Sequence, residues 1–201
     1  MKPIVTSALA AAAAILCTSA SQAAPITYVA KLSGPAESPP NSSLGTGNAV
    51  IIIDTAANTL AVNVTFSGLT GTTTASHIHC CTAVPGVSTA IVATETPFFD
   101  SFPIGVTSGS YTHLFDLTAA SSWNPAFITV SGGTIALAES NFASGVAAGA
   151  AYLNIHTSVV ASGEIRGFLT VPVPEPAALA VVLTGLLGLG WRRTRPCSPP
   201  A

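Results

Sequence analysis

The feature that most constrains the fold is a series of short β-like segments separated by glycine, proline and asparagine. The clearest is 59–69, where apolar residues occupy the even positions and polar or small residues most of the odd ones. Successive side chains of a β-strand point to opposite faces, so this pattern is typical of a strand with one buried face. Comparable segments lie at 26–33, 47–54, 75–80, 110–117, 151–156 and 164–171.

A single segment, 134–149, has apolar residues at roughly helical spacing. The segments 83–100 and 121–131 are interrupted by proline and glycine or lack a clear period, and we expect loops there. Seven short strands with turns between them and one short helix predict an all-β domain, either an antiparallel β-sandwich or a Greek-key barrel.

The N-terminus has the parts of a secretory signal peptide. Lys2 is followed by an apolar, alanine-rich run from 4 to 17 and then by a small-x-small cleavage pattern. We expect cleavage after Ala23, which makes 1–23 the signal peptide.

The C-terminal segment, 172–201, combines a chain break, an apolar run and a basic cluster. Its first motif is Val173-Pro174-Glu175-Pro176; an uncharged run from 177 to 191 follows, and Arg192 and Arg193 come directly after it. We interpret the run as a short transmembrane helix held by the arginines.

This order of features closely resembles the PEP-CTERM sorting signal of exported bacterial proteins. The resemblance implies an exosortase-type sorting enzyme as partner. It also implies an inner-membrane-anchored intermediate and a final location in the cell envelope or outside the cell, where an extracellular matrix component would be a binding partner.

The segment between the two ends carries very little positive charge. Lys31 and Arg166 are its only basic residues, against seven Asp and Glu, which gives a net charge of −5. Binding to nucleic acid requires basic residues that neutralise phosphates, so we do not expect a nucleic-acid partner.

Three of the four histidines lie in two strand-like segments, at His77, His79 and His156. Alternation places His77 and His79 on one face of their strand, and Asn154 and His156 on one face of theirs. Three imidazoles on neighbouring strands are a ligand set that copper or zinc accepts. The sequence therefore predicts a candidate metal site.

Another interpretation of these residues stays open. The polar patch of the histidines, Asn154, Glu164 and Arg166 can also be a hydrogen-bonded structural cluster on the outer face of a sheet. We expect Glu164 and Arg166 to act from outside the ligand set or as a structural pair. His113 belongs to another predicted strand and is expected to play no part.

The adjacent cysteines Cys80 and Cys81 follow His79 directly. In an exported protein they can form a vicinal disulfide, an intermolecular bridge or a pair of thiolate ligands beside His79. We favour the disulfide or a redox-labile pair over metal ligation.

Several separated motifs resemble the CHRD domain, the domain named after chordin. They include Leu32-Ser33-Gly34, Gly45-Thr46-Gly47, His77-Ile78-His79, the segment 152–157 and the segment 163–169, in the order that defines the family. Cys80-Cys81 replaces a Gly-Pro turn common there. The resemblance covers most of 24–171 and implies an exported domain with no well-established biochemical activity.

No catalytic residue is predicted. The sequence lacks a Gly-x-Ser-x-Gly elbow, a phosphate-binding loop and a dinucleotide fingerprint. We therefore expect a non-enzymatic protein of the cell envelope or extracellular matrix, with a copper- or zinc-binding or redox protein as the alternative.

Overall fold

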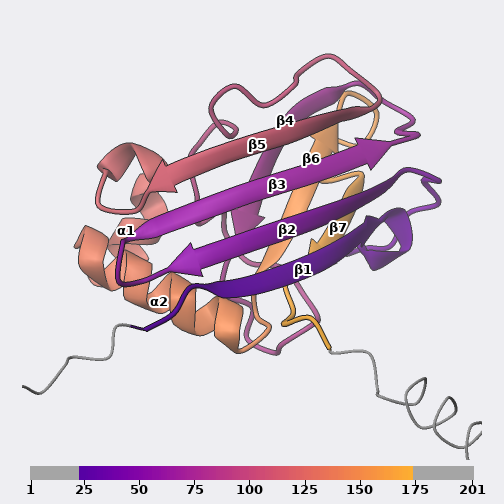
Figure 1. Cartoon of the computed structure of the whole chain (residues 1–201). Coiled ribbons are helices and arrows are strands. Elements are labelled where there is room, and N and C mark those ends of the chain that lie inside the picture. The colour runs from indigo at the N-terminus through magenta and orange to yellow at the C-terminus, as the bar shows by residue number, and fades with distance from the viewer. Residues whose placement is uncertain (1–22, 174–201) are drawn as a thin grey trace, which may run out of the picture.

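The computed structural model describes residues 23–173, which form one seven-stranded antiparallel sheet (Figure 1). The strands are β1 (Ile26–Ser33), β2 (Thr46–Asp54), β3 (Thr59–Ser67), β4 (Thr73–His79), β5 (Gly109–Asp116), β6 (Tyr152–Thr157) and β7 (Ile165–Phe168). Their order in the sheet is β4-β6-β7-β1-β2-β3-β5.

The sheet is strongly curled, so that β4, β6 and β7 lie behind β1, β2, β3 and β5 in Figure 1. The inner face carries the apolar side chains that alternation predicts. On β3, Leu60 and Val62 are fully buried, while Leu114 on the outer face of the neighbouring β5 is 64% exposed. The core therefore fills the inside of a half-barrel.

Two helices lie against one end of this half-barrel: α1 (Pro125–Val130) and α2 (Ile135–Ala147) (Figure 1). Phe127 of α1 and Phe142 of α2 are buried against Trp123, with ring centroids 6.0 and 5.6 Å from that indole. Two short 3₁₀ turns, Gly34–Ala36 and Ala120–Ser122, complete the regular structure of residues 23–173.

The seven predicted strands are confirmed, with boundaries within three residues, and the helix predicted at 134–149 is α2. The loop expected at 121–131 is wrong, because α1 occupies most of it. Asn124 caps its N-terminus by accepting from Ala126 N, and Pro125 takes the first helical position. Both are helix-start signals, but a helix of six residues is too short to show a period.

The expected all-β antiparallel fold is confirmed, and its form is a single sheet curled into a half-barrel. Strand β1 pairs with β2 on one side and with β7 on the other, so the two halves of the sheet are continuous. Within residues 23–173 no helix has the length and apolar character needed to cross a membrane. The predicted C-terminal helix and nearly all of the predicted signal peptide fall outside the described residues.

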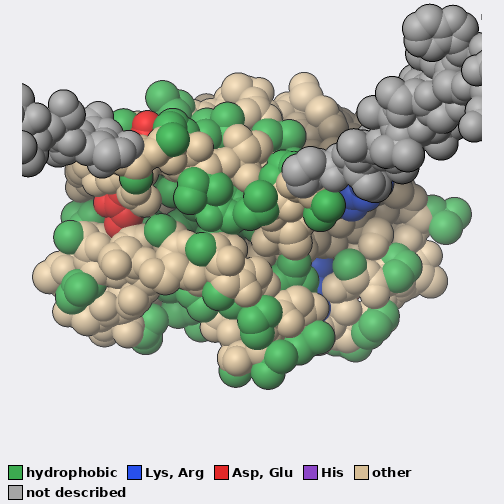
Figure 2. Space-filling model, turned by 60° about the horizontal axis from the view of Figure 1, so that its bottom comes forward, with side chains coloured by type: hydrophobic (Ala, Val, Ile, Leu, Met, Phe, Trp, Pro, Cys, Tyr) green, Lys and Arg blue, Asp and Glu red, His purple; other side chains and the backbone are tan. Residues whose placement is uncertain are grey.

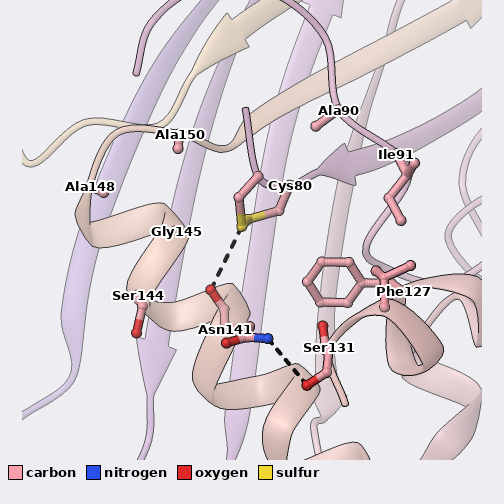
Figure 3. Close-up of a pocket in the computed structure, with 12 residues that line it drawn as sticks. Cys80, Ala90, Ile91, Phe127, Ser131, Asn141, Ser144, Gly145, Ala148 and Ala150 are labelled. Atoms are coloured by element: carbon pink, nitrogen blue, oxygen red, sulfur yellow. Dashed lines mark hydrogen bonds between the residues drawn. A yellow bond between two sulfur atoms is a disulfide. The ribbon is translucent and has the colours of Figure 1, made fainter. Parts of the chain in front are cut away.

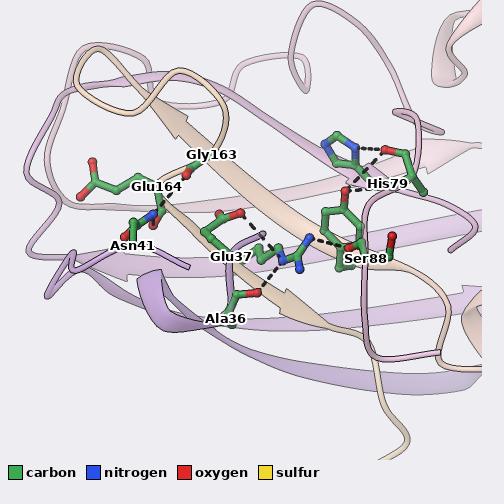
Figure 4. Close-up of polar contacts among 10 residues, drawn as sticks. Ala36, Glu37, Asn41, His79, Ser88, Gly163 and Glu164 are labelled. Carbon is green, nitrogen blue, oxygen red and sulfur yellow. Dashed lines mark hydrogen bonds and ion pairs between the residues drawn. The ribbon is translucent and has the colours of Figure 1, made fainter. Parts of the chain in front are cut away.

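A buried carboxylate joins three turns at one end of β6 and β7. Glu164 has no exposed surface, and its two oxygens accept hydrogen bonds from Ser43 Oγ (2.6 Å), Thr70 N (2.6 Å), Gly71 N (3.1 Å) and Thr157 Oγ1 (2.6 Å). Asn41 Nδ2 adds a bond to the Glu164 carbonyl (3.0 Å; Figure 4). Burial acts to raise the pKa of Glu164, but the four bonds to its carboxylate outweigh burial and hold the pKa below its ordinary value.

We predict that Glu164→Gln lowers the free energy of unfolding by about 3 kcal/mol at pH 7, because an amide cannot accept all four bonds and places a donor against donors. The depressed pKa means that the carboxylate stabilises the fold above its unfolded pKa and loses this effect as the pH falls through the folded pKa. Urea unfolding from pH 7 down to pH 3 measures the loss of stability and its pH dependence. The difference in free energy of unfolding between the variant and the wild type should become smaller in acid.

Glu139→Gln on α2, a half-buried carboxyl outside this network, is the matched control. Equal loss of stability in the two variants would contradict a special role for Glu164.

Candidate metal centre

The pairing of β4 with β6 brings three histidines together on the outer face of the sheet. His77 lies opposite Asn154, Ala75 opposite His156, and His79 opposite Tyr152. Between them, Ile78, Leu153 and Ile155 point into the core and are fully buried. One ring nitrogen from each of His77, His79 and His156 lies within 4.8 Å of the others.

Each imidazole is oriented by a backbone carbonyl at its other nitrogen. The contacts are His77 Nε2 to Pro97 O (2.6 Å), His79 Nδ1 to Ala90 O (2.9 Å; Figure 4) and His156 Nδ1 to Ala161 O (3.0 Å). A carbonyl oxygen only accepts, so these three nitrogens carry the hydrogens. The opposite nitrogen of each neutral ring is left with a free lone pair.

Those opposite nitrogens have no hydrogen-bond partner. Among residues 23–173, five buried side-chain nitrogen or oxygen atoms are unpaired: His77 Nδ1, His79 Nε2, His156 Nε2, Asn154 Oδ1 and Glu37 Oε1. Leaving a buried polar atom unpaired costs about 1–3 kcal/mol, so such atoms are rare and rarely cluster. All five belong to side chains grouped on the outer side of β4, β6 and β7, and a cation would satisfy the three imidazole lone pairs.

The protonation states favour the same chemistry. Burial lowers the pKa of His77 and of His79 to about 4, and burial also lowers the pKa of His156. The rings are therefore neutral at pH 7, the state in which imidazole ligates a metal. The backbone carbonyls fix their tautomers in the way that outer contacts orient histidine ligands in metal sites.

Arg166 extends the polar face onto β7, opposite Asn154. Its Nε and Nη1 donate to Ala36 O (2.6 Å) and Ser88 O (2.8 Å), and its guanidinium lies 4.7 Å from the Tyr152 ring centroid. These contacts hold the loops on either side of the face against the sheet (Figure 4).

The acidic partner of Arg166 is Glu37, with Oε2 at 3.8 Å from Nε, and not Glu164. Burial raises the pKa of Glu37 to about 7, although Arg166 acts to lower it. The predicted pairing of Glu164 with Arg166 is wrong, as is the place of Glu164 in the histidine patch. β7 begins only at Ile165, so strict strand alternation does not extend to Glu164, whose carboxylate is bound by the turns described above.

Sequence reasoning did not assign Glu37 to the site. Glu37 is the one acidic residue of the proline-rich loop 34–43, and this is the only feature of the sequence that could have indicated a role for it. Nothing local in the sequence shows that this loop folds back over β7.

The remaining predicted residues lie apart from the three rings. Cys80 and Cys81 are joined in a vicinal disulfide, so their sulfurs are not free thiolates beside His79. His113 lies on β5 with its ring centroid 4.4 Å from that of Phe115, outside the cluster as expected.

The metal-free protein is predicted to lose stability as the pH falls from about 6.5 to 4.5. Over this range the unfolded histidines take up protons, whereas folded His77 and His79 do not until about pH 4. Glu37 opposes them, because its raised pKa stabilises the fold in acid and this effect is lost as the pH rises through about 7. The unfolded state binds on the order of one proton more than the folded state, so the free energy of unfolding changes by about 1.4 kcal/mol per pH unit.

Urea unfolding across this range in a chelator measures the slope. His77→Gln/His79→Gln should flatten or reverse it, since glutamine can still donate to Pro97 O and Ala90 O but does not titrate. His113→Gln controls for the loss of an imidazole elsewhere. A double variant with the wild-type slope would contradict the assignment.

Most of the described domain matches a known protein family. The family model for the CHRD domain matches residues 28–169, which contain nearly the whole sheet, all three clustered histidines and Arg166. Neither a curated protein nor a solved structure matches the chain significantly. Because the family model covers well over half of the chain, the protein belongs to the CHRD domain family.

Proposed function

We propose that this CHRD-domain protein is an exported binding protein of the cell envelope, and that His77, His79 and His156 form its binding site for zinc or copper. The observation that carries the proposal is the set of three buried and unpaired imidazole nitrogens, on three rings that each place one nitrogen within 4.8 Å of the others. The chemical character of the donors, neutral nitrogen on rigid strands, suits both metals.

The alternative was a hydrogen-bonded structural cluster. In such a cluster each lone pair meets a donor, as the four acceptor positions of Glu164 do elsewhere in the same domain. Around the three histidines the backbone supplies acceptors instead of donors, at Pro97, Ala90 and Ala161. This contrast within the described residues favours a cation over a purely structural cluster.

Three protein ligands leave a tetrahedral ion one further position, which water or another small ligand takes. Asn154 and Glu37 carry the two other buried and unpaired acceptors. Arg166 and its two carbonyl partners keep the loops around the site in place. We assign these residues to binding and positioning and propose no catalytic step for them.

Purified wild-type protein is predicted to contain close to one equivalent of zinc or copper, and His79→Gln or His156→Gln to lose most of it. Removing one of three ligands should weaken binding by at least about 100-fold, beyond the 10–100-fold typical of an outer contact. Elemental analysis and titration calorimetry on chelator-treated protein measure this.

His113→Gln is the matched control, because it removes an imidazole from β5 and leaves the cluster intact. Absence of near-stoichiometric binding of both metals by the wild type would reject the site.

Export and sorting form the second part of the proposal, supported by the two ends of the sequence. The predicted signal peptide 1–23 and the PEP-CTERM-like segment 172–201 flank the domain matched by the family model. An exosortase-type enzyme is the proposed partner.

The very low charged content, 7% of residues, leaves only isolated charged patches on the face seen in Figure 2.

Deleting Val173 to Arg195 is predicted to change the fractionation of the protein from the membrane and envelope to the soluble fraction, and to abolish processing at the C-terminus. Immunoblotting of cell fractions from a strain that has the sorting enzyme measures both. Replacing Pro174-Glu175-Pro176 by alanines separates processing, which should be lost, from membrane retention, which should persist. Unchanged fractionation of the deletion would contradict the sorting role.

A further inference from the structure

A vicinal disulfide lies one residue from the proposed metal ligands. Strand β4 ends at His79, and the Cys80–Cys81 disulfide follows it at the edge of a groove of about 690 Å³ (Figure 3). The groove is also bordered by Ala90 and Ile91 and by α2. The disulfide therefore contacts both the segment that orients His79 and the helix that closes the half-barrel.

One short segment, 90–92, joins the disulfide to the ligand. Ala90 O accepts from His79 Nδ1 (2.9 Å), and Cys80 N donates to Ile91 O (3.1 Å). His79 itself forms an isolated β-bridge with Val92. A displacement of the Cys80 backbone is thus transmitted directly to the carbonyl that sets the orientation of the His79 ring.

On the side of α2 the two sulfurs lie close to the helix backbone. The two sulfurs pack against Gly145 of α2 so closely that a methyl group at this position would overlap both. Beyond Cys81, Thr82 N donates to Ala150 O (2.9 Å), which fixes the chain that leaves the groove. Two thiols need a non-bonded separation of about 3.5–4 Å, whereas a disulfide holds its sulfurs at about 2 Å. After reduction the Cys81 thiol has room to move into the groove, whereas Cys80 is 1% exposed, so any movement of Cys80 displaces the chain on one of its sides.

A reductant can reach the bond. Cys80 is only 1% exposed, whereas Cys81 is exposed in the groove. The Cys81 sulfur is accordingly the one open to attack by a thiolate.

We propose that the Cys80–Cys81 disulfide controls the affinity of the His77, His79 and His156 site for its metal: opening the bond releases His79 from its binding orientation. This inference rests on the proposed metal-binding function. A dithiol supplies the electrons: one thiolate attacks Cys81 Sγ, Cys80 leaves as a thiolate and is protonated, and the second thiol displaces Cys81. The dithiol becomes a disulfide, and two electrons and two protons pass to the cysteines.

The test compares zinc affinity of the full chain before and after reduction. Cys17→Ser and Cys197→Ser leave Cys80 and Cys81 as the only cysteines of the four in the sequence. A trialkylphosphine, removed by gel filtration under argon, converts the disulfide to thiols and is itself oxidised to its oxide. Loss of one oriented ligand should weaken zinc binding 10–100-fold, and reoxidation should restore it.

A further Cys80→Ser/Cys81→Ser change provides the control. It should bind zinc weakly both with and without phosphine treatment, which separates the effect of the disulfide from any effect of the reagent. If this variant does not fold, reduction and reoxidation of the parent protein decide the question. Equal or tighter zinc binding by the reduced protein would overturn the inference.

The state of the His79 ring gives an independent readout in the metal-free protein. Its NMR signals should shift on reduction by more than those of His113, and unchanged His79 signals would overturn the redox coupling. Failure of the oxidised protein to bind zinc or copper would instead reject the proposed metal site. The two failures are thus distinguishable.

Discussion

The register between β4 and β6 is the constraint on which both the core and the candidate site depend. With His77 opposite Asn154, the residues Ile78, Leu153 and Ile155 point inward and the three imidazoles point outward. A slip of one residue would exchange these faces, burying histidines in the core and exposing isoleucine and leucine. Burial of the apolar face therefore fixes the geometry of the polar one.

Two buried charged groups hold the loops that this pairing leaves at its edges. Glu164 binds the turns before β2 and after β3 to the end of β6, and Arg166 binds the loops containing Ala36 and Ser88 to β7. Glu164 and Arg166 are two residues apart but have different surroundings. The Glu164 carboxylate accepts hydrogen bonds, whereas the Arg166 guanidinium donates them. The unpaired ring nitrogens of the three histidines differ from these two groups, because most other buried polar groups of the described domain have hydrogen-bond partners.

The position of the disulfide links the site to the helical end of the fold. Cys80 follows the last residue of β4 and lines the groove beside α2. The segment 90–92 contacts Cys80 through Ile91 O and His79 through Ala90 O. On its other side the disulfide packs closely against Gly145 of α2.

The sequence by itself determined the seven strands, helix α2 and the faces on which the histidines lie. Short β-like segments bounded by turn residues placed all seven strands. Period-two alternation put His77 with His79 and Asn154 with His156, because alternation is a local property of extended chain. The tertiary structure alone decided which strands are neighbours, and therefore that they form one continuous curled sheet. It also decided that Glu37 and not Glu164 meets Arg166, and that Pro97, Ala90 and Ala161 supply acceptors to the three rings. These contacts join residues from separate loops and strands, and strand periodicity carries no information about where a loop returns.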